Sequence, residues 1–430
     1  MDARGRLLAI GLAGALVLVA GLVLLLVRDD EEAAPAGADA SAARFSAGPT
    51  TQSGNASPSP TNGGPQEVAA EFGRIEREVV ALRGLEPPEI EPAEIITRRQ
   101  LARELEELLD AEWTDEELRR SNLTLRAMGL LEPGQDLRRL SEQLLAGQVI
   151  GFYDPAEKRM VVVSDEGLSV TARITYAHEY THALQDAAFD TFEEREALTD
   201  DDAILARQAL EEGDAVAVMY EWGISHLSPA ELFEVGAQPV PDMTGIPDWM
   251  LQQLLFPYET GWAFVQALRA EAGWPAVDDA YTDVPASTEQ VIHPDKYATG
   301  EEPIEVAAPT TAASLGVGWE DLDATTMGEA MIAIWLEELG VQPSSADPAA
   351  AGWGGDRLSV AAGPDDELLM AWRIAWDGPS DADEFADAAA ALQPRAGLSA
   401  TLLRPSATET LVLHATSDEL LAAGARLFGG

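Results

Sequence analysis

The sequence predicts an α+β fold with two folded parts: a mainly helical domain that contains a small β-hairpin, and a small C-terminal α+β module of order ββαββα. Three patterns predict this fold. Apolar residues recur at helical spacing from residue 66 to about 147 and again from about 169 to 222. Two short β-prone runs lie between these stretches, and strand-like and helix-like segments alternate beyond about residue 345.

An apolar run near the start of the chain predicts an N-terminal transmembrane helix. Residues 7–27 are almost uninterruptedly apolar, and a helix needs roughly 20 such residues to cross a bilayer. Arg4 and Arg6 precede the run and acidic residues 29–32 follow it, so the N-terminus is expected to be cytoplasmic. We expect residues 1–28 to form an uncleaved signal anchor in the cell membrane, with the folded part of the chain extracytoplasmic; a cleaved signal peptide is the alternative.

A linker is expected after this helix. Residues 29–65 are rich in Ala, Pro, Ser and Gly, and a segment of this composition cannot bury enough apolar surface to fold. The remaining chain is long enough for two cores. We expect one domain over residues 66–345 and the C-terminal module over residues 346–430.

Charge and cysteine content exclude several classes of function. The chain has 75 acidic and 27 basic residues and a formal net charge of -48; such a field repels phosphate backbones, so no nucleic-acid partner is expected. The absence of cysteine excludes disulfides, thiolate nucleophiles and zinc sites made by Cys. A metal ion in this protein has to be bound by His and carboxylate side chains.

The first part of the domain is expected to be a helical lobe that leads into a hairpin. Its helices are indicated by apolar residues at helical spacing: Val68, Phe72, Ile75, Val79, Leu101, Leu105, Leu108, Leu123, Leu125, Met128 and Leu131. Prolines separate these helices. The β-prone runs 148–153 and 160–163 flank a turn that begins at Asp154-Pro155, which predicts a β-hairpin.

The pentapeptide at residues 178–182 predicts a metal site. His178 and His182 are four residues apart on a helix expected from about residues 169–171 to 186, so both imidazoles stand on one face and reach a single Zn²⁺. Glu179 reaches a metal-bound water as a general base. The chain has only five histidines, which argues against a chance pair; a merely solvated or capped pair is the alternative. Metal-assisted hydrolysis is the leading hypothesis.

The third ligand has to come from another helix, since a catalytic zinc takes three protein ligands and a water. The metzincin continuation of Gly and His is absent, because Gln185 and Ala188 occupy those positions. On the next predicted helix, Glu212 shares a face with apolar residues, whereas Glu211 shares one with polar residues. A carboxylate on an apolar face is costly unless it is paired or metal-bound. We therefore expect Glu212 to be the ligand and Glu211 to be solvated; Glu211 as the ligand, or a mere ion pair, are the alternatives.

The motif His-Glu-Tyr-Thr-His-Ala-Leu-Gln-Asp resembles the zinc helix of thermolysin-like gluzincins, where a Glu on the following helix is the third ligand. Further stretches resemble a family of largely uncharacterised, membrane-anchored bacterial proteins predicted to be metallopeptidases. These stretches are Gly-Phe-Tyr-Asp-Pro in the hairpin, Leu-Glu-Glu-Gly-Asp-Ala, Pro257-Tyr258 with Gly261, and residues 287–294. The resemblance spans about residues 66–300 and implies a zincin-like metallopeptidase domain with one catalytic zinc.

The chain also departs from the gluzincin pattern. The separation between His182 and Glu212 is longer, and Val216 stands where an acidic residue is expected four positions after the Glu. Asp214 is a candidate for the role of that acidic residue. Because zincins bind an extended substrate at a sheet edge beside the metal helix, the predicted hairpin is either this edge or a purely structural element.

The function implied is a membrane-tethered, extracytoplasmic zinc metalloprotease that acts on a protein or peptide, with Glu179 as general base. A donor to the oxyanion is usual in such sites, and His293, in a polar loop, is the best candidate, with Tyr153, Tyr180 and Tyr297 as competitors. The alternatives are a catalytically silent zincin-fold envelope scaffold and a hydrolase of non-peptide bonds. The oligomeric state stays open.

The C-terminal module is expected to contain strands at residues 357–360, 368–376, 398–403 and 409–415 and helices at 381–392 and 417–427. The order ββαββα can cover one sheet face with two helices. The sequence leaves open whether this module binds substrate, a partner or only the rest of the chain.

Overall fold

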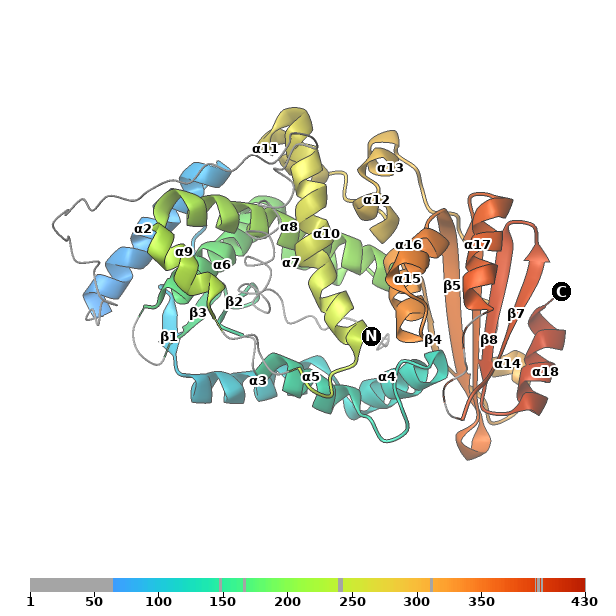
Figure 1. Cartoon of the computed structure of the whole chain (residues 1–430). Helices are drawn as coiled ribbons and strands as arrows, with labels where there is room; N and C mark the ends of the chain where they lie inside the picture. Colours follow the sequence, from blue (N-terminus) through green and yellow to red (C-terminus); the bar gives the residue numbers. More distant parts are fainter. Residues whose placement is uncertain are drawn as a thin grey trace, which may run out of the picture.

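The computed structural model describes residues 65–146, 149–164, 168–238, 243–309, 312–390, 392, 395 and 397–429. The described chain is α+β, mostly helical, with one three-stranded and one five-stranded sheet. The two sheets lie at opposite ends of the molecule with helices between them (Figure 1). The predicted transmembrane helix and nearly all of the predicted linker lie outside the described residues. Among the helices that are described, none has the length and apolar character needed to cross a membrane.

The helices expected before the hairpin are present. They are α2 (Pro65–Arg83), α3 (Arg98–Glu112), α4 (Asp115–Met128) and α5 (Leu137–Ala146). Capping boxes define two of their starts: Thr97 pairs with Gln100 at α3, and Thr114 pairs with Glu117 at α4. Gly129 ends α4 in the left-handed conformation that glycine adopts without steric cost.

The predicted hairpin is confirmed and belongs to a three-stranded sheet. Strands β2 (Gly151–Asp154) and β3 (Arg159–Val163) are antiparallel, and the Asp154 side chain accepts hydrogen bonds from the backbone N–H groups of Ala156 and Glu157 in the turn. A third strand that the sequence analysis did not identify, β1 (Glu94–Ile96), pairs parallel with β3. The order β1-β3-β2 makes β2 an edge strand.

Helix α6 (Val170–Phe189) carries the His-Glu pair and packs against α2, the hairpin and α8 (Asp201–His226). It begins where the sequence predicts, because Ser169 caps it by accepting a hydrogen bond from the N–H of Ala172. The short helix α7 (Thr191–Glu196) joins α6 to α8. Phe72 of α2 stacks on Tyr176 of α6 with ring centroids 4.1 Å apart, which fixes α2 on the outer side of α6.

Helix α10 (Asp248–Ala272) crosses α8 at very short range. A Cβ atom at Gly213 would lie 2.2 Å from the carbonyl oxygen of Gly261, and one at Gly261 would lie 2.1 Å from the oxygen of Ala209. The two backbones can approach this closely only because both positions are glycine. The smaller helices around this pair are α9 (Pro229–Gly236), α11 (Trp274–Ala280), α12 (Thr288–Ile292), α13 (Pro294–Thr299) and α14 (Ala312–Leu315).

The C-terminal sheet contains the four predicted strands and one more. Its strands are β4 (Glu320–Thr325), β5 (Trp353–Ala362), β6 (Leu368–Trp376), β7 (Ser399–Ser406) and β8 (Glu409–Ala415), in the antiparallel order β4-β5-β6-β8 with β7 outside β8. Its helices are α15 (Gly328–Glu338), α16 (Pro343–Ala350), α17 (Pro379–Ala389) and α18 (Asp418–Phe428). Strand β4 pairs with β5, so the sheet includes residues that precede position 346.

The expectation that both predicted helices cover one face of this sheet is wrong. Phe385 of α17 packs on Trp376, on the face that also carries Trp372. Helix α18 instead packs with Leu369 and Leu413, whose side chains point to the opposite face. Strands β6 and β7 run parallel, so α17 crosses over between them, whereas α18 follows the last strand and is free to cover the other side.

The sheet and part of the helical lobe share one core. Backbone carbonyl groups at the end of α4 and just after it accept hydrogen bonds from ring nitrogens of buried side chains in β8, α15 and α10. Ala127 accepts from His414, Met128 from Trp335, and Leu130 from Trp249. The predicted helical lobe is therefore divided: α2 packs on the His-Glu helix, whereas α4 packs on the C-terminal sheet.

Candidate metal centre

Two buried side chains and one partly buried side chain converge between α6 and α8. Nε2 of His178 lies 3.0 Å from Nε2 of His182 and 3.1 Å from Oε2 of Glu212, and the distance from His182 Nε2 to Glu212 Oε2 is 3.3 Å. The two His and the Glu thus form a triangle of possible ligand atoms. The structure brings together the three residues that the sequence analysis selected as metal ligands.

The size and chemistry of this triangle fit a single metal ion. Ligand atoms that lie about 2.0–2.1 Å from a tetrahedral zinc ion are about 3.3 Å from one another. The side chain of His178 is fully buried, and the Nδ1 atom of this residue has no hydrogen-bond partner among the described residues. The two imidazole nitrogens and the carboxylate oxygen do not have enough N–H donors between them for every pair to form a hydrogen bond. A single cation in the centre interacts favourably with all three atoms.

A hydrogen-bonded chain fixes the orientation of His182. Its Nδ1 lies 2.9 Å from Oε1 of Gln185, and Nε2 of Gln185 donates to the carbonyl oxygen of Glu211 at 2.9 Å. An amide oxygen can only accept, so when the ring of His182 is neutral, as a metal ligand has to be, its proton is on Nδ1 and the Nε2 lone pair faces the triangle. The sequence analysis did not identify Gln185 in this role, although it lies one helical turn after His182 on the same helix.

The close crossing of α8 and α10 lies next to two residues of the triangle, Glu212 and His178. Gly213, where α10 comes nearest, directly follows the ligand residue Glu212. One turn before Gly261 on α10, the ring of Tyr258 lies nearly parallel to that of His178, with centroids 6.1 Å apart. The contact between Gly213 and Gly261 therefore affects both the position of the Glu212 carboxylate and the packing of Tyr258 against His178.

Glu179 lies beside the triangle with one oxygen bound and one free. Its Oε2 accepts a hydrogen bond of 3.1 Å from the backbone N–H of Tyr153 in β2, while the buried Oε1 has no hydrogen-bond partner among the described residues. Burial raises the pKa of this carboxyl well above its ordinary value, and the charge of His182 acts in the opposite direction. A carboxyl with a raised pKa and an unpaired oxygen is suited to accept a proton.

The pKa values of the three possible ligands are shifted in different directions. Burial lowers the pKa of His178. Burial also acts to lower the pKa of His182, but the charge of Glu212 outweighs it and raises that pKa to about 9. Burial acts to raise the pKa of Glu212, and the nearby histidines outweigh it, so this carboxylate stays ionised. The anionic carboxylate therefore attracts a cation to this buried position.

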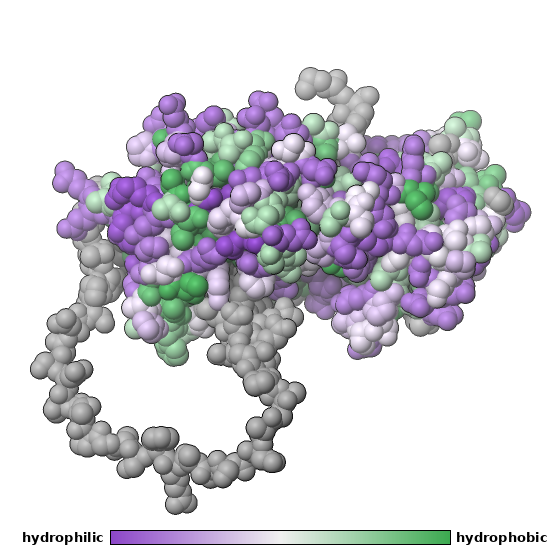
Figure 2. Space-filling view, turned by 90° about the horizontal axis from the view of Figure 1, so that it is seen from above, coloured by the Kyte–Doolittle hydropathy of each residue, from purple (hydrophilic) through white to green (hydrophobic). Residues whose placement is uncertain are grey.

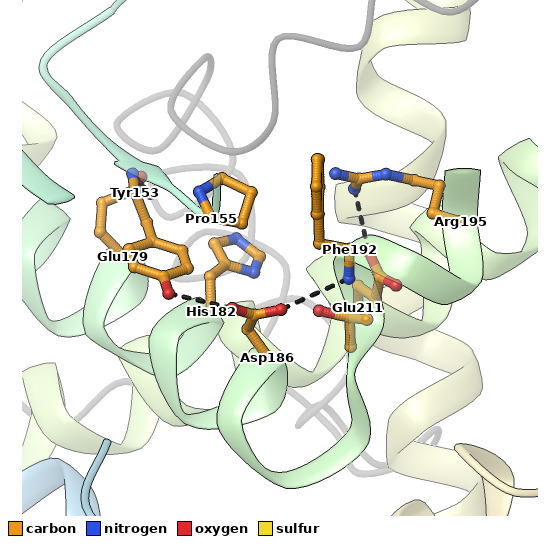
Figure 3. A pocket seen from close by; sticks show the side chains of 9 residues that line it. Tyr153, Pro155, Glu179, His182, Asp186, Phe192, Arg195 and Glu211 are labelled. Atoms are coloured by element: carbon orange, nitrogen blue, oxygen red, sulfur yellow. Dashed lines mark hydrogen bonds and ion pairs between the residues drawn. The ribbon is translucent and has the colours of Figure 1, made fainter. Parts of the chain in front are cut away.

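The site opens into a pocket between the hairpin and α7 (Figure 3). Nine side chains line it: Tyr153, Pro155, Glu179, His182, Asp186, Thr191, Phe192, Arg195 and Glu211. Asp186, near the end of α6, accepts a hydrogen bond from the hydroxyl of Tyr153 at 3.0 Å. It thereby joins the hairpin to the end of α6.

The expectation that Glu211 is solvated is wrong. Its carboxylate is buried between Arg207, which donates from Nε at 2.9 Å, and Arg195, which donates from Nη1 at 3.1 Å. Glu211 and Glu212 are therefore both buried, and they differ in their partners rather than in their exposure. Asp214 is also buried, but it pairs with Arg83 and accepts from the hydroxyl of Tyr281.

His293 is not part of this group. Its Nε2 lies 2.9 Å from Oε1 of Glu329, at the contact between α12 and α15, and it does not line the pocket. The hydrogen bond with Glu329 raises the pKa of His293. Of the competing tyrosines, Tyr297 donates to the carbonyl of Asp283 and only Tyr153 lines the pocket.

A second group of carboxylates surrounds an ammonium group. Nζ of Lys296 lies 2.6–2.8 Å from carboxylate oxygens of Glu289, Glu301 and Asp377. The lysine thus supplies the positive charge for this cluster, which joins α12 and α13 to the turn after β6.

The hydropathy of the molecular surface agrees with the acidic composition of the chain. In the space-filling view, hydrophilic side chains cover most of the visible face, and hydrophobic ones form small separate groups (Figure 2). Scattered apolar groups of this size are normal on a folded protein.

Comparisons with known proteins cover the two parts of the chain unevenly. A protein-family model described as a domain of unknown function (DUF8575) matches residues 315–419, which contain all five strands of the C-terminal sheet and none of the triangle residues. No curated protein matches the chain. The chain is also similar to a solved structure from Chloroflexus aurantiacus described as "a putative hydrolase with a novel fold", with 19% sequence identity and a TM-score of 0.37 over 54% of this chain and 89% of that one. Neither description names a zinc peptidase, so the resemblance to gluzincins rests on the residues of the site.

Proposed function

We propose that this protein is a zinc-dependent metallopeptidase in which His178, His182 and Glu212 bind the metal and Glu179 is the general base. One observation supports this proposal most strongly. The three ligand atoms lie 3.0–3.3 Å apart, and a buried carboxyl with an unpaired oxygen belongs to the residue next to His178. A structural zinc site has no need of such a base.

The chemistry follows from these positions. A bound zinc ion supplies a water of lowered pKa and polarises the substrate carbonyl. Glu179 accepts a proton from the attacking water through Oε1 and later passes it to the leaving amine. The backbone N–H of Tyr153 holds the other oxygen of Glu179, so the base keeps its orientation during both transfers.

The position of β2 at the edge of the described three-stranded sheet supports a peptide as the substrate. The carbonyl of Ile150 accepts from Val163 of β3, so alternate residues of β2 point their backbone groups toward β3 and the others point away. The N–H of Tyr153, which reaches Glu179, is one of the groups that point away. An extended peptide that pairs with this edge would lie alongside the base.

The location outside the cytoplasm is a further part of the proposal. It is supported by the apolar residues 7–27 with their charged flanks and by the linker composition of residues 29–65. The folded part would then act outside the membrane, joined to the anchor by these residues.

Metal analysis combined with a proteolysis assay tests the proposal. The full chain and its Glu179→Gln variant are purified, loaded with zinc and incubated with casein and a mixed peptide library. We expect about one zinc per chain in both proteins and cleavage only by the unsubstituted chain. Zinc binding without cleavage by either protein would favour the silent scaffold, and equal cleavage by both would exclude Glu179 as the base.

A further inference from the structure

The pocket contains one side chain whose charge the proposed chemistry does not use. Among the nine residues that line the pocket, Arg195 is the only Lys or Arg. In Figure 3, Arg195 and Phe192 lie on one side of His182, and Tyr153 and Glu179 lie on the other. The side chain of Arg195 lines the pocket and keeps 21% of its surface exposed.

The charge of Arg195 is not fully neutralised by its partner. Nη1 of Arg195 donates to Oε2 of Glu211, and this is the only hydrogen bond of the Arg195 side chain within the described part of the chain. The other oxygen of Glu211 accepts a hydrogen bond from Nε of Arg207, whose side chain is only 3% exposed. Two guanidinium groups thus share the one carboxylate of Glu211, and Arg195 is the one of the two that lines the pocket.

The position of this charge is fixed relative to the metal ligands. Glu211 holds Arg195 through its side chain, and its carbonyl accepts from Gln185, which orients His182. The next residue on α8 is Glu212, the third ligand of the triangle. Of these two adjacent residues, Glu211 positions the guanidinium and Glu212 would hold the metal together with the two histidines.

We propose that Arg195 binds a carboxylate of the substrate, on the side of the scissile bond that faces α7. This inference rests on the proposed peptidase function and specifies its substrate. The guanidinium has planar donors left that match a carboxylate with two parallel hydrogen bonds. The net charge of -48 repels acidic peptides at a distance, so the selection has to come from this local contact in the partly shielded pocket.

The carboxylate can belong to a free C-terminus or to an Asp or Glu side chain. The first source makes the enzyme release short C-terminal fragments, and the second makes it cleave inside chains beside acidic residues. Both sources offer the same chemical group to Arg195. The probe peptides therefore have to vary the two sources separately.

Binding to the inactive, zinc-loaded Glu179→Gln protein provides a readout that does not depend on turnover. The probes are penta-alanine with a free C-terminus, penta-alanine amide, and the amides of Ala-Ala-Glu-Ala-Ala and Ala-Ala-Gln-Ala-Ala, measured by calorimetry. We expect one of the two carboxylate peptides to bind at least about tenfold more tightly than its uncharged counterpart, as expected for a hydrogen bond to a charged group. The preferred peptide identifies the source of the carboxylate.

Substitution of Arg195 tests whether this residue is responsible for the preference. In Arg195→Gln the preference should disappear, and in Arg195→Lys a part of it should remain because the charge is kept without the planar donors. Arg269→Gln is the matched control, since Arg269 also pairs with one glutamate, Glu221, and is 18% exposed, but lies outside the pocket. In the active protein, Arg195→Gln should raise KM for the preferred peptide about tenfold with little change in kcat.

The possible outcomes separate this inference from the proposed function. Equal binding of charged and uncharged peptides, or a preference that survives Arg195→Gln, would overturn the role of Arg195 while leaving the peptidase function intact. Absence of zinc-dependent cleavage by the unsubstituted protein would instead contradict the peptidase function. A preference lost in both Arg195→Gln and Arg269→Gln would indicate a general structural effect and would also overturn the assignment.

Discussion

Oε2 of Glu212 lies 3.1 Å from Nε2 of His178, although 34 residues separate them in the sequence. Helix α7 and the start of α8 fill this interval, and the return of α8 along α6 brings the carboxylate back to the histidines. The same turn of α8 places Glu211 against Arg195. The third residue of the triangle and the carboxylate that binds Arg195 are thus consecutive residues of one helix.

The roles of these two glutamates can be separated by substitution. Glu212→Ala should weaken zinc binding by more than about 100-fold, because it removes a ligand rather than an orienting group. Glu211→Ala should retain zinc but lower the free energy of unfolding, because it leaves the guanidinium groups of Arg195 and Arg207 without their shared carboxylate. Competition with a chelator measures the affinity, and urea unfolding measures the stability. The reverse pattern would show that Glu211 is the ligand.

Gln185 is expected to orient His182 without binding the metal. Gln185→Ala removes the acceptor for Nδ1 of His182, so zinc affinity should fall by about 10- to 100-fold. The exposed Gln100, which only caps α3, provides a matched control in which Gln100→Ala leaves the zinc affinity unchanged. An unaltered affinity in Gln185→Ala would mean that the ring of His182 is held in some other way.

The crossing of α8 and α10 predicts opposite effects at two glycines of one helix. Gly213→Ala would place a Cβ 2.2 Å from the carbonyl of Gly261 and force the helices apart, which should cost at least about 2 kcal/mol of unfolding free energy. At Gly223, also in α8, an added Cβ meets nothing within 4 Å. Gly223→Ala should therefore stabilise the protein by about 0.5–1 kcal/mol. Thermal and urea unfolding check both values, and equal effects at the two sites would contradict the described crossing.

The buried His414 predicts a pH dependence of stability. Burial lowers its pKa to about 4 in the folded state, whereas the unfolded chain has a histidine pKa of about 6.5. Between these values the unfolded chain binds the proton and the folded chain does not. The free energy of unfolding should therefore fall as the pH drops from about 6.5 to 4, by up to about 1.4 kcal/mol for each pH unit.

The variant His414→Phe isolates this contribution from that of the acidic residues. It removes the titrating group, so the difference in unfolding free energy between the two proteins should change steadily with pH over the same window. A difference that does not vary with pH would mean that His414 does not carry this shift.

The local part of the site was predictable from sequence because it depends on one helix. His178, Glu179 and His182 are placed by the spacing of an α-helix, and Ser169 marks the start of that helix. Glu212 was predicted from its position on an apolar face. The prediction that Glu211 is solvated failed, because Arg195 and Arg207 pair with its carboxylate and allow it to be buried. The spacing of apolar residues along the helix does not reveal these partners.

Other features depend on contacts between distant residues and escaped prediction. Strand β1 has only three residues, which is too short for a periodic pattern, and it forms by pairing with β3. The polar sequence around His293 predicted a histidine in the catalytic site, but in the structure its ring pairs with Glu329 of α15 and does not line the pocket. The strands of the C-terminal sheet were predictable from their β-prone composition, whereas the face that each helix covers depends on the strand order.

The most direct test of the proposed zinc site is anomalous scattering at the zinc absorption edge from crystals of the zinc-loaded protein. We predict one strong peak inside the triangle of His178, His182 and Glu212, about 2.0–2.1 Å from each ligand atom, with one further position open to water. A triangle without a peak, or zinc bound instead among Glu289, Glu301 and Asp377, would contradict it.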